Sequence, residues 1–456
     1  MITAVRNRLR RWKSHSALYL GLFMAQWRSM QRQVMPVTTA LGPQLRLLII
    51  PCDPWTVMGS RGDQAMIAGV VDTLRERIMA GTIPNSAAGA SGLDVAIVVA
   101  SQSAAFAVQQ AGHRALRAWP VAQSELHYCV GRLRDYAPHV CVVLGADTMD
   151  GFYSPSSTLR LICLADLMAR SGVRTCILGF SFNRKPVRQI AYAFRHVSPL
   201  LHLNLRDALS LERFERTAQA PARLVADAAF LMHPDASTVK MAGVRRFVAS
   251  QQAAGRQVLG INAHPMLFMG RSGGPSGDRV ARLQQALVHA LADLLRQRPV
   301  ALVLLSHDDR SGHGDAAFLR SLHDALAPEW ADRVLLPPCQ MNAPELKAAA
   351  SLMHGVVSGR MHLAIAALGS GVPVAALTYQ DKFEGLFAHF GLDGQWLLSG
   401  EAALQHTVLA NWLLQFHDAL PALSRQVRQR LPDVLRLAAR NFDDLLQPEP
   451  VHKETS

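Results

Sequence analysis

The sequence predicts an α/β protein of two domains, each with a largely parallel sheet. Three observations carry this prediction. The 456 residues are enough for two domains of ordinary size. Short runs rich in Val, Ile and Leu alternate with helical stretches, as buried parallel strands alternate with crossover helices. The alternation pauses at residues 233–254 and then restarts. We therefore expect two Rossmann-like domains, at 41–235 and 236–400, facing each other across a cleft.

Eleven apolar runs are expected to form the strands. In the first domain they lie at 47–51, 95–100, 140–144, 175–179, 201–207 and 223–227, and the last two end in an acidic residue. In the second domain they lie at 257–262, 300–305, 334–336, 355–358 and 374–377. Because the carboxyl ends of parallel strands share one edge of a sheet, polar residues that follow these runs are the candidate site residues.

The two ends of the chain differ from its body. Residues 401–447 are expected to be helical and 448–456 to form a disordered tail. Residues 1–40 form a basic amphipathic segment, with no acidic residue before position 36 and with these cations: Arg6, Arg8, Arg10, Arg11, Lys13, Arg28 and Arg32. Two interpretations stay open for residues 1–35: a helix lying on an anionic membrane surface, or a helix packed on the protein's own body.

The net charge of +13 and the pI near 10.0 favour anionic partners such as phosphorylated substrates or a phospholipid surface. Nucleic acid is not expected as a partner, because aromatic residues make up only 6% and zinc-finger spacing is missing. No apolar run approaches the roughly 18–20 residues that cross a membrane. We expect a cytoplasmic protein that associates peripherally with the inner face of the plasma membrane.

The most informative stretch follows the strand at 355–358. Gly359, Arg360 and His362 stand between that strand and an Ala-rich helix. Backbone N–H groups at a helix start, a guanidinium and an imidazole around one point suit a small anion. Lys382 follows the next strand and could neutralise the same charge or pair with Glu384.

Polar residues also follow strands of the first domain. Gly62 and Asp63 lie in a Gly-Ser-Arg-Gly-Asp loop between a strand and a helix, and Asp147 follows the strand at 140–144. A carboxylate at such a strand end more often contacts a substrate than stabilises a core, because burying it alone is costly. Arg206 could clamp an anion or pair with Asp207 or Asp227.

Histidines end two strands of the second domain. His264 follows the strand at 257–262, and His307 follows the strand at 300–305 and precedes Asp308, Asp309, His313 and Asp315. The spacing of this second group matches no zinc or two-metal pattern, so no metal is expected. His264 and His307 remain candidates for contact with a polar ligand.

In combination, these stretches resemble the polysaccharide pyruvyl transferase family. The stretches that carry the resemblance are 59–65 (Gly-Ser-Arg-Gly-Asp-Gln-Ala), 205–210, 225–230, 357–364 and 371–373. Ser60 stands where the family usually has Asn. The resemblance implies a fold like that of B-type glycosyltransferases, and transfer of pyruvate from phosphoenolpyruvate to a sugar as a ketal. It implies neither a metal nor a nucleotide cofactor.

By the same resemblance, Arg360 and His362 would hold phosphoenolpyruvate. We also expect Lys382 and Arg206 to bind it. We expect His362 to be the general acid and Asp63 or Asp147 to be the base. The acceptor, a sugar of an exopolysaccharide or of its lipid-linked precursor, would contact Gly62, Asp63, Asp147, His264 and His307. Two alternatives are a nucleotide-sugar glycosyltransferase of the same architecture and a non-catalytic component of a polysaccharide assembly complex.

Overall fold

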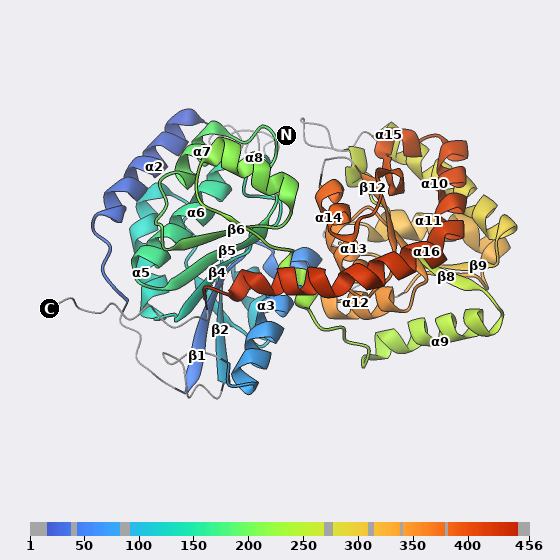
Figure 1. Cartoon of the computed structure of the whole chain (residues 1–456), viewed down its shortest axis with the longest axis horizontal. Helices are drawn as coiled ribbons and strands as arrows, with labels where there is room; N and C mark the ends of the chain where they lie inside the picture. Colours follow the sequence, from blue (N-terminus) through green and yellow to red (C-terminus); the bar gives the residue numbers. More distant parts are fainter. Residues whose placement is uncertain are drawn as a thin grey trace. The chain divides into compact units, whose positions relative to one another are not determined.

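The computed structural model describes most of the chain (Figure 1). The described residues are 16–37, 43–82, 92–268, 277–308, 314–337, 341–378 and 382–445. Several sequence predictions concern residues outside these ranges. They are the cations from Arg6 to Lys13, the residues Asp309 and His313, and the tail at 448–456.

The chain divides into two compact units, each with its own parallel sheet. The first comprises Met1–Met58, Val70–Ala228 and Leu437–Ser456, and the second comprises Gly59–Gly69 and Ala229–Arg436. The chain therefore passes between the units four times. The prediction of an α/β protein with two parallel sheets is confirmed. The domain limits expected from the sequence, and a cleft between the domains, stay predictions.

The first unit holds a seven-stranded sheet in the order β3-β2-β1-β4-β5-β6-β7. Its strands are β1 (Gln44–Ile50), β2 (Gly92–Val99), β3 (Arg114–Arg117), β4 (Val140–Val143), β5 (Arg174–Phe180), β6 (Leu201–Leu205) and β7 (Arg223–Leu224). All neighbours are parallel, and Leu48 of β1 is opposite Ala96 of β2 and Cys141 of β4. The chain reverses its direction across the sheet at β1 and β4, which is where Rossmann-like domains bind ligands.

Helices cover both faces of this sheet (Figure 1). They are α3 (Arg61–Met79, shared with the second unit), α4 (Gln102–Gln110), α5 (Leu126–Asp135), α6 (Pro155–Arg170), α7 (Arg188–Phe194) and α8 (Ala208–Ala218). A further helix, α2 (Ala17–Gln31), packs against α6.

One face of α2 is buried on the protein's own body. Leu20, Phe23, Trp27 and Met30 recur at helical spacing and are buried. The Trp27 indole N–H donates to Asp166 Oδ2 at 2.8 Å, which fixes the helix on α6. This packing is one of the two interpretations that the sequence left open. No described helix is both long and apolar enough to cross a membrane.

The first unit is completed by residues from the far end of the chain. After α16 (His406–Ala439), a short 3-10 turn at Arg440–Phe442 brings Asn441 into this unit. Its side-chain oxygen accepts the N–H of Gly179 at 2.9 Å, and its amide donates to the carbonyl of Ala226 at 2.8 Å. The end of the predicted helical region thus binds the interior strand β5 and the segment that follows the edge strand β7.

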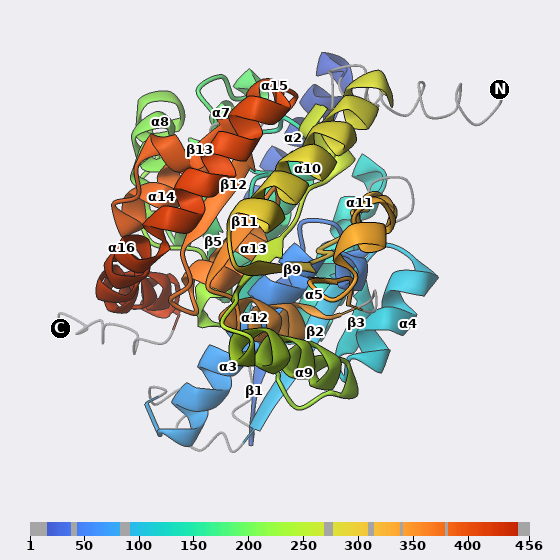
Figure 2. The same ribbon diagram turned by 90° about the vertical axis from the view of Figure 1, so that its right-hand side faces the viewer.

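The second unit holds a six-stranded parallel sheet in the order β10-β9-β8-β11-β12-β13. Its strands are β8 (Gln257–Ile261), β9 (Val300–Leu304), β10 (Val334–Leu335), β11 (Gly355–Ser358), β12 (Val374–Thr378) and β13 (Leu397–Ser399). Its helices are α9 (Val239–Ala253), α10 (Gly277–Gln297), α11 (Ala316–Trp330), α12 (Ala343–Ser351), α13 (Met361–Leu368), α14 (Phe383–Phe390) and α15 (Gly400–Ala403), with most of α16. Figure 2 shows α9 beside α12.

Two of the strands were not expected from the sequence, β3 and β13. Arg114–Arg117 forms an edge strand with arginine at both ends, and Leu397–Ser399 is only three residues long. Neither has the continuous apolar run that marks a buried central strand.

Candidate functional site

Arg360 and His362 lie at the carboxyl edge of the second sheet, between β11 and α13. Ser358 shapes this junction, because its hydroxyl accepts the N–H of Arg360 at 3.1 Å and donates to the carbonyl of Arg360 at 2.8 Å. Arg360 is the N-cap residue of α13 and His362 belongs to the first turn. Both side chains are therefore held at a helix N-terminus.

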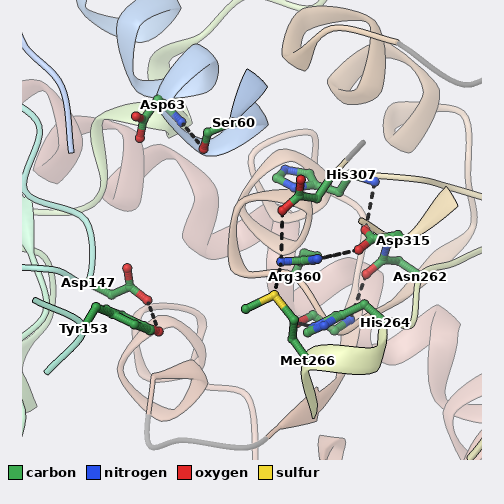
Figure 3. Close-up of polar contacts among 12 residues, drawn as sticks. Ser60, Asp63, Asp147, Tyr153, Asn262, His264, Met266, His307, Asp315 and Arg360 are labelled. Atoms are coloured by element: carbon green, nitrogen blue, oxygen red, sulfur yellow. Dashed lines mark hydrogen bonds and ion pairs between the residues drawn. The ribbon is translucent and has the colours of Figure 1, made fainter. Parts of the chain in front are cut away.

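Arg360 is bound by two carboxylates that follow strand β9 (Figure 3). Its Nε and Nη2 donate to Asp315 Oδ1 at 3.0 and 2.6 Å. Its Nη1 lies 3.5 Å from Asp308 Oδ2 and 3.6 Å from the sulfur of Met266. Asp315 thus orients the guanidinium along one side, and the contacts of Nη1 with Asp308 and Met266 are longer.

Asp315 connects three strand ends of the second sheet. Its Oδ2 accepts the side-chain amide of Asn262 at 2.9 Å and the backbone N–H of His307 at 3.0 Å (Figure 3). Burial raises the pKa of Asp315, and the guanidinium of Arg360 opposes that rise. The carboxylate fixes Arg360 relative to the loops that follow β8 and β9.

His264 packs against the backbone of the same junction. Its Nε2 lies 2.8 Å from the carbonyl of Gly359, and because a carbonyl only accepts, Nε2 carries the hydrogen. Burial lowers the pKa of His264 well below its usual value, and Arg360 lowers it further. A Cβ on Gly359 would lie 2.8 Å from the His264 ring, so only glycine fits there.

His307 and His362 lie side by side, with ring centroids 6.4 Å apart and planes 10° from parallel. Burial lowers the pKa of His307 well below its usual value. His362, Arg360 and Arg61 lower this pKa further, and Asp308 acts in the opposite sense. His307 is therefore a neutral imidazole in the folded protein at neutral pH.

The loop at 59–63 contacts Asp308 and His362. Gly59–Gly69 groups with the second unit, and Ser60 forms an antiparallel bridge with Asp308. A Cβ on Gly62 would lie 2.6 Å from Nδ1 of His362, so glycine lets α3 begin against that imidazole. Asp63 is buried in the first turn of α3, where the helix dipole favours a carboxylate.

Two predicted site residues lie in the first unit. Arg206, at the end of β6, donates from Nη1 to Asp227 at 3.0 Å and from Nε to the hydroxyl of Ser181 at 2.7 Å. Of the two alternatives for Arg206, the structure contains the pairing with Asp227. Asp147 is partly buried after β4, and the hydroxyl of Tyr153 donates to it at 3.1 Å (Figure 3).

The second unit thus gathers most of the predicted site residues. Gly62, Asp63, His264, His307, Arg360 and His362 all belong to it, and Lys382 is the N-cap residue of α14 in the same unit. The sequence did not predict that Asn262 and Asp315 orient the arginine. Their one signal was that each follows a strand of the second sheet.

Chemically, this site combines a fixed guanidinium, the neutral imidazoles of His264 and His307, and the imidazole of His362. The guanidinium can hold a carboxylate or a phosphate. An imidazole at a helix start can exchange a proton with a bound ligand. The arrangement suits an acidic ligand that undergoes proton transfer.

The structure is similar to solved sugar-processing enzymes. UDP-GlcNAc 2-epimerase from Neisseria meningitidis, solved bound to UDP-GlcNAc, has a TM-score of 0.51 at 12% identity, covering 88% of this chain and 99% of that chain. A glycosyltransferase from Rickettsia africae has a TM-score of 0.51 at 9% identity, covering 89% of this chain and 100% of that chain. These likenesses show the fold, that of B-type glycosyltransferases and related epimerases, and nothing of the reaction.

Among curated proteins, none matches this chain. The family model described as polysaccharide pyruvyl transferase matches residues 111–381. The match includes Arg206, Arg360 and His362, whereas the loop at 59–65 lies before it. Because the match spans more than half of the sequence, the chain belongs to the polysaccharide pyruvyl transferase family.

Proposed function

We propose that this protein transfers pyruvate from phosphoenolpyruvate to a sugar and forms a pyruvate ketal. The acceptor would be part of an exopolysaccharide or of its lipid-linked precursor. The family supports pyruvyl transfer to a polysaccharide in general. The observation that carries the donor assignment is Arg360 beside His362 at the start of α13. Phosphoenolpyruvate brings the two anionic groups that a guanidinium and a helix N-terminus favour.

Arg360 would hold the donor through Nη1. Asp315 engages Nε and Nη2 at 3.0 and 2.6 Å, whereas Asp308 lies 3.5 Å from Nη1. A donor carboxylate or phosphate would displace this weaker contact and leave the shorter ones intact. Lys382 would add a second cation for the phosphate. Donor binding by Arg206 stays a prediction from the sequence.

His362 would act as the general acid. It protonates the methylene carbon of phosphoenolpyruvate, and an oxocarbenium-like centre develops at the neighbouring carbon. A sugar hydroxyl adds there and gives its proton to a carboxylate base, from which the proton returns to His362 and restores the acid. The C–O bond to phosphate then breaks, phosphate leaves with the electron pair, and a second hydroxyl closes the ketal, its proton passing to the phosphate. Asp63 is our candidate for the base; Asp147 stays the alternative.

The direct test is which donor the protein consumes. We expect depletion of phosphoenolpyruvate and release of phosphate in the presence of a sugar acceptor, with a new ketal methyl signal by NMR. A parallel incubation contains UDP-GlcNAc, because a structural neighbour was solved with that ligand. Consumption of the nucleotide sugar, with phosphoenolpyruvate untouched, would replace our proposal by a glycosyltransferase. If neither is consumed, a non-catalytic role is favoured.

His362→Ala tests the acid assignment. We expect kcat to fall by about 10²–10⁴, the usual contribution of a general acid. His406→Ala is the matched control, because His406 is an exposed histidine at the start of α16 in the same unit. Circular dichroism verifies that both variants fold. Wild-type turnover in His362→Ala would exclude the acid role.

We also propose that the exposed face of α2 contacts an anionic membrane. Leu18 and Leu22 are exposed there although the opposite face is buried, and the exposed Arg28 follows in the last turn. Such a face combines apolar insertion with attraction to anionic lipids. In flotation with phosphatidylserine vesicles, Leu18→Gln with Leu22→Gln should reduce the bound fraction. Val239→Gln, an exposed apolar control in the second unit, should not. Equal flotation of all three proteins would contradict this membrane contact.

A further inference from the structure

The first unit contains an arginine-lined cavity that the proposed reaction does not use. Its volume is about 300 Å³, at the lower end of ligand-site volumes. Its described lining residues are Arg184, Leu209, Glu212, Arg213, Arg216 and Thr217. Arg184 comes from the loop after β5, and the others come from α8. Figure 1 shows the place of α8 in the first unit. The cavity is thus formed by the loop that follows one strand and the helix that follows the next.

The charge of the lining favours an anion. Three arginines and one glutamate among the described lining residues give a net charge of +2. Glu212 is engaged by Arg216, whose Nη2 lies 2.7 Å from it one helical turn away. Lys185 and Arg188 follow Arg184 closely in the sequence and are exposed, which adds positive potential. A neutral sugar or a cation would find no matching charge here.

An aromatic cluster fixes the backbone that carries Arg184 and Arg213. Arg213 is buried and immediately precedes Phe214, whose ring centroid lies 5.1 Å from that of Phe182 and 5.0 Å from that of Phe194. Phe182 in turn lies two residues before Arg184, and its N–H is bound by the hydroxyl of Ser210 at 3.0 Å. Both arginines therefore project from backbone that the aromatic cluster fixes, as a preorganised site requires.

We propose that this cavity binds the diphosphate group of a ligand. A diphosphate diester carries two negative charges, which balance the +2 of the lining, and guanidinium groups bind phosphate oxygens in a fork geometry. Resting on the proposed function, the ligand class is the diphosphate-linked form of the sugar acceptor. The cavity would then recognise the linkage of the acceptor, whereas the donor is held in the second unit.

Inorganic pyrophosphate is the first probe, measured by isothermal titration calorimetry on the full chain. We expect binding by the wild type, and at least tenfold weaker binding by the double variant Arg184→Gln with Arg216→Gln. Both side chains are exposed, so folding should survive. The control pair Arg117→Gln with Arg132→Gln removes two exposed arginines of the same unit. Equal affinity in the cavity variant and the control variant would overturn the site.

Two further measurements identify the ligand. Displacement of pyrophosphate by a polyprenyl diphosphate sugar in detergent, and not by UDP-GlcNAc, supports the lipid-linked acceptor. Displacement by UDP-GlcNAc alone would overturn that assignment. Phosphoenolpyruvate affinity should be equal in the wild type and the cavity variant, and a loss in the variant would mean that the cavity holds the donor instead. Because pyrophosphate binding needs no turnover, its failure is distinguishable from failure of the proposed reaction.

Discussion

Each unit pairs an arginine with an aspartate at the carboxyl edge of its sheet, but the two pairs differ in environment. In the first unit Arg206 and Asp227 are 5% and 2% exposed, and Ser181 binds the same guanidinium. In the second unit Arg360 is 14% exposed, and Asp315 engages two of its three nitrogens. The contacts of the third nitrogen with Asp308 and Met266 are longer. The difference favours a structural role for Arg206 and is consistent with our proposal that Arg360 binds the donor.

The largest effect is expected when the first pair is broken. Asp227→Ala would leave the buried guanidinium of Arg206 without this carboxylate, so the free energy of unfolding should fall by about 3–5 kcal/mol. Urea unfolding measures this loss. The double variant Arg206→Met with Asp227→Leu should recover most of it, because apolar groups of similar volume can replace a buried pair. Full stability of Asp227→Ala, combined with weaker donor binding, would instead assign Arg206 to the ligand.

A smaller loss is expected when the second pair is broken. Asp315→Ala removes the carboxylate that accepts hydrogen bonds from Arg360, from Asn262 and from the His307 N–H. Arg360 keeps its contact with Asp308, however, and is more exposed than Arg206. We expect the free energy of unfolding to fall by about 2–3 kcal/mol. The KM for phosphoenolpyruvate should rise severalfold as well, because the guanidinium loses its orientation. A stability loss with an unchanged KM would make Asp315 purely structural.

Acid should destabilise the second unit. Burial and Arg360 hold the pKa values of His264 and His307 well below 6.5, so the unfolded chain binds more protons than the folded one. Their contribution is complete above the unfolded pKa and is lost as pH falls through 6.5. Between about pH 7.5 and 6.0 we expect a loss of about 1.5 kcal/mol for the two together. Urea unfolding at both pH values measures this loss. In His307→Gln, the free energy of unfolding should change less between the two pH values. A change as large as that of the wild type would contradict the neutral buried imidazole.

The smallest effect compares the two arginines by conservative substitution. Arg360→Lys retains the charge but not the fork, so the KM for phosphoenolpyruvate should rise about tenfold, or roughly 1.4 kcal/mol. Arg206→Lys should raise it less. Arg246→Lys, an exposed control on α9, should leave it unchanged. Equal rises in Arg360→Lys and Arg206→Lys would break the comparison and favour the donor role that the sequence predicted for Arg206.

The sequence predicted the parallel sheets because their central strands are continuous apolar runs, such as Val140–Val143 and Val300–Leu304. It also predicted that Arg360 and His362 lie at a helix start, because an apolar strand, a glycine and an Ala-rich stretch follow one another in the chain. It could not predict that Gly62 touches His362, since 300 positions separate them, nor that Asp315 orients Arg360. Such contacts depend on which strands are neighbours, and periodicity does not encode strand order.

Asn441 has a consequence for how the chain is made. Its side-chain amide binds Gly179 in β5 and Ala226 after β7, so the first unit gains these two hydrogen bonds only from a residue that the ribosome adds after the second unit. During synthesis the N-terminal sheet lacks these two hydrogen bonds while about two hundred further residues emerge, at roughly 5–20 residues per second. For about 10–40 s, the nascent chain thus depends on its remaining contacts, or on a chaperone, to avoid aggregation.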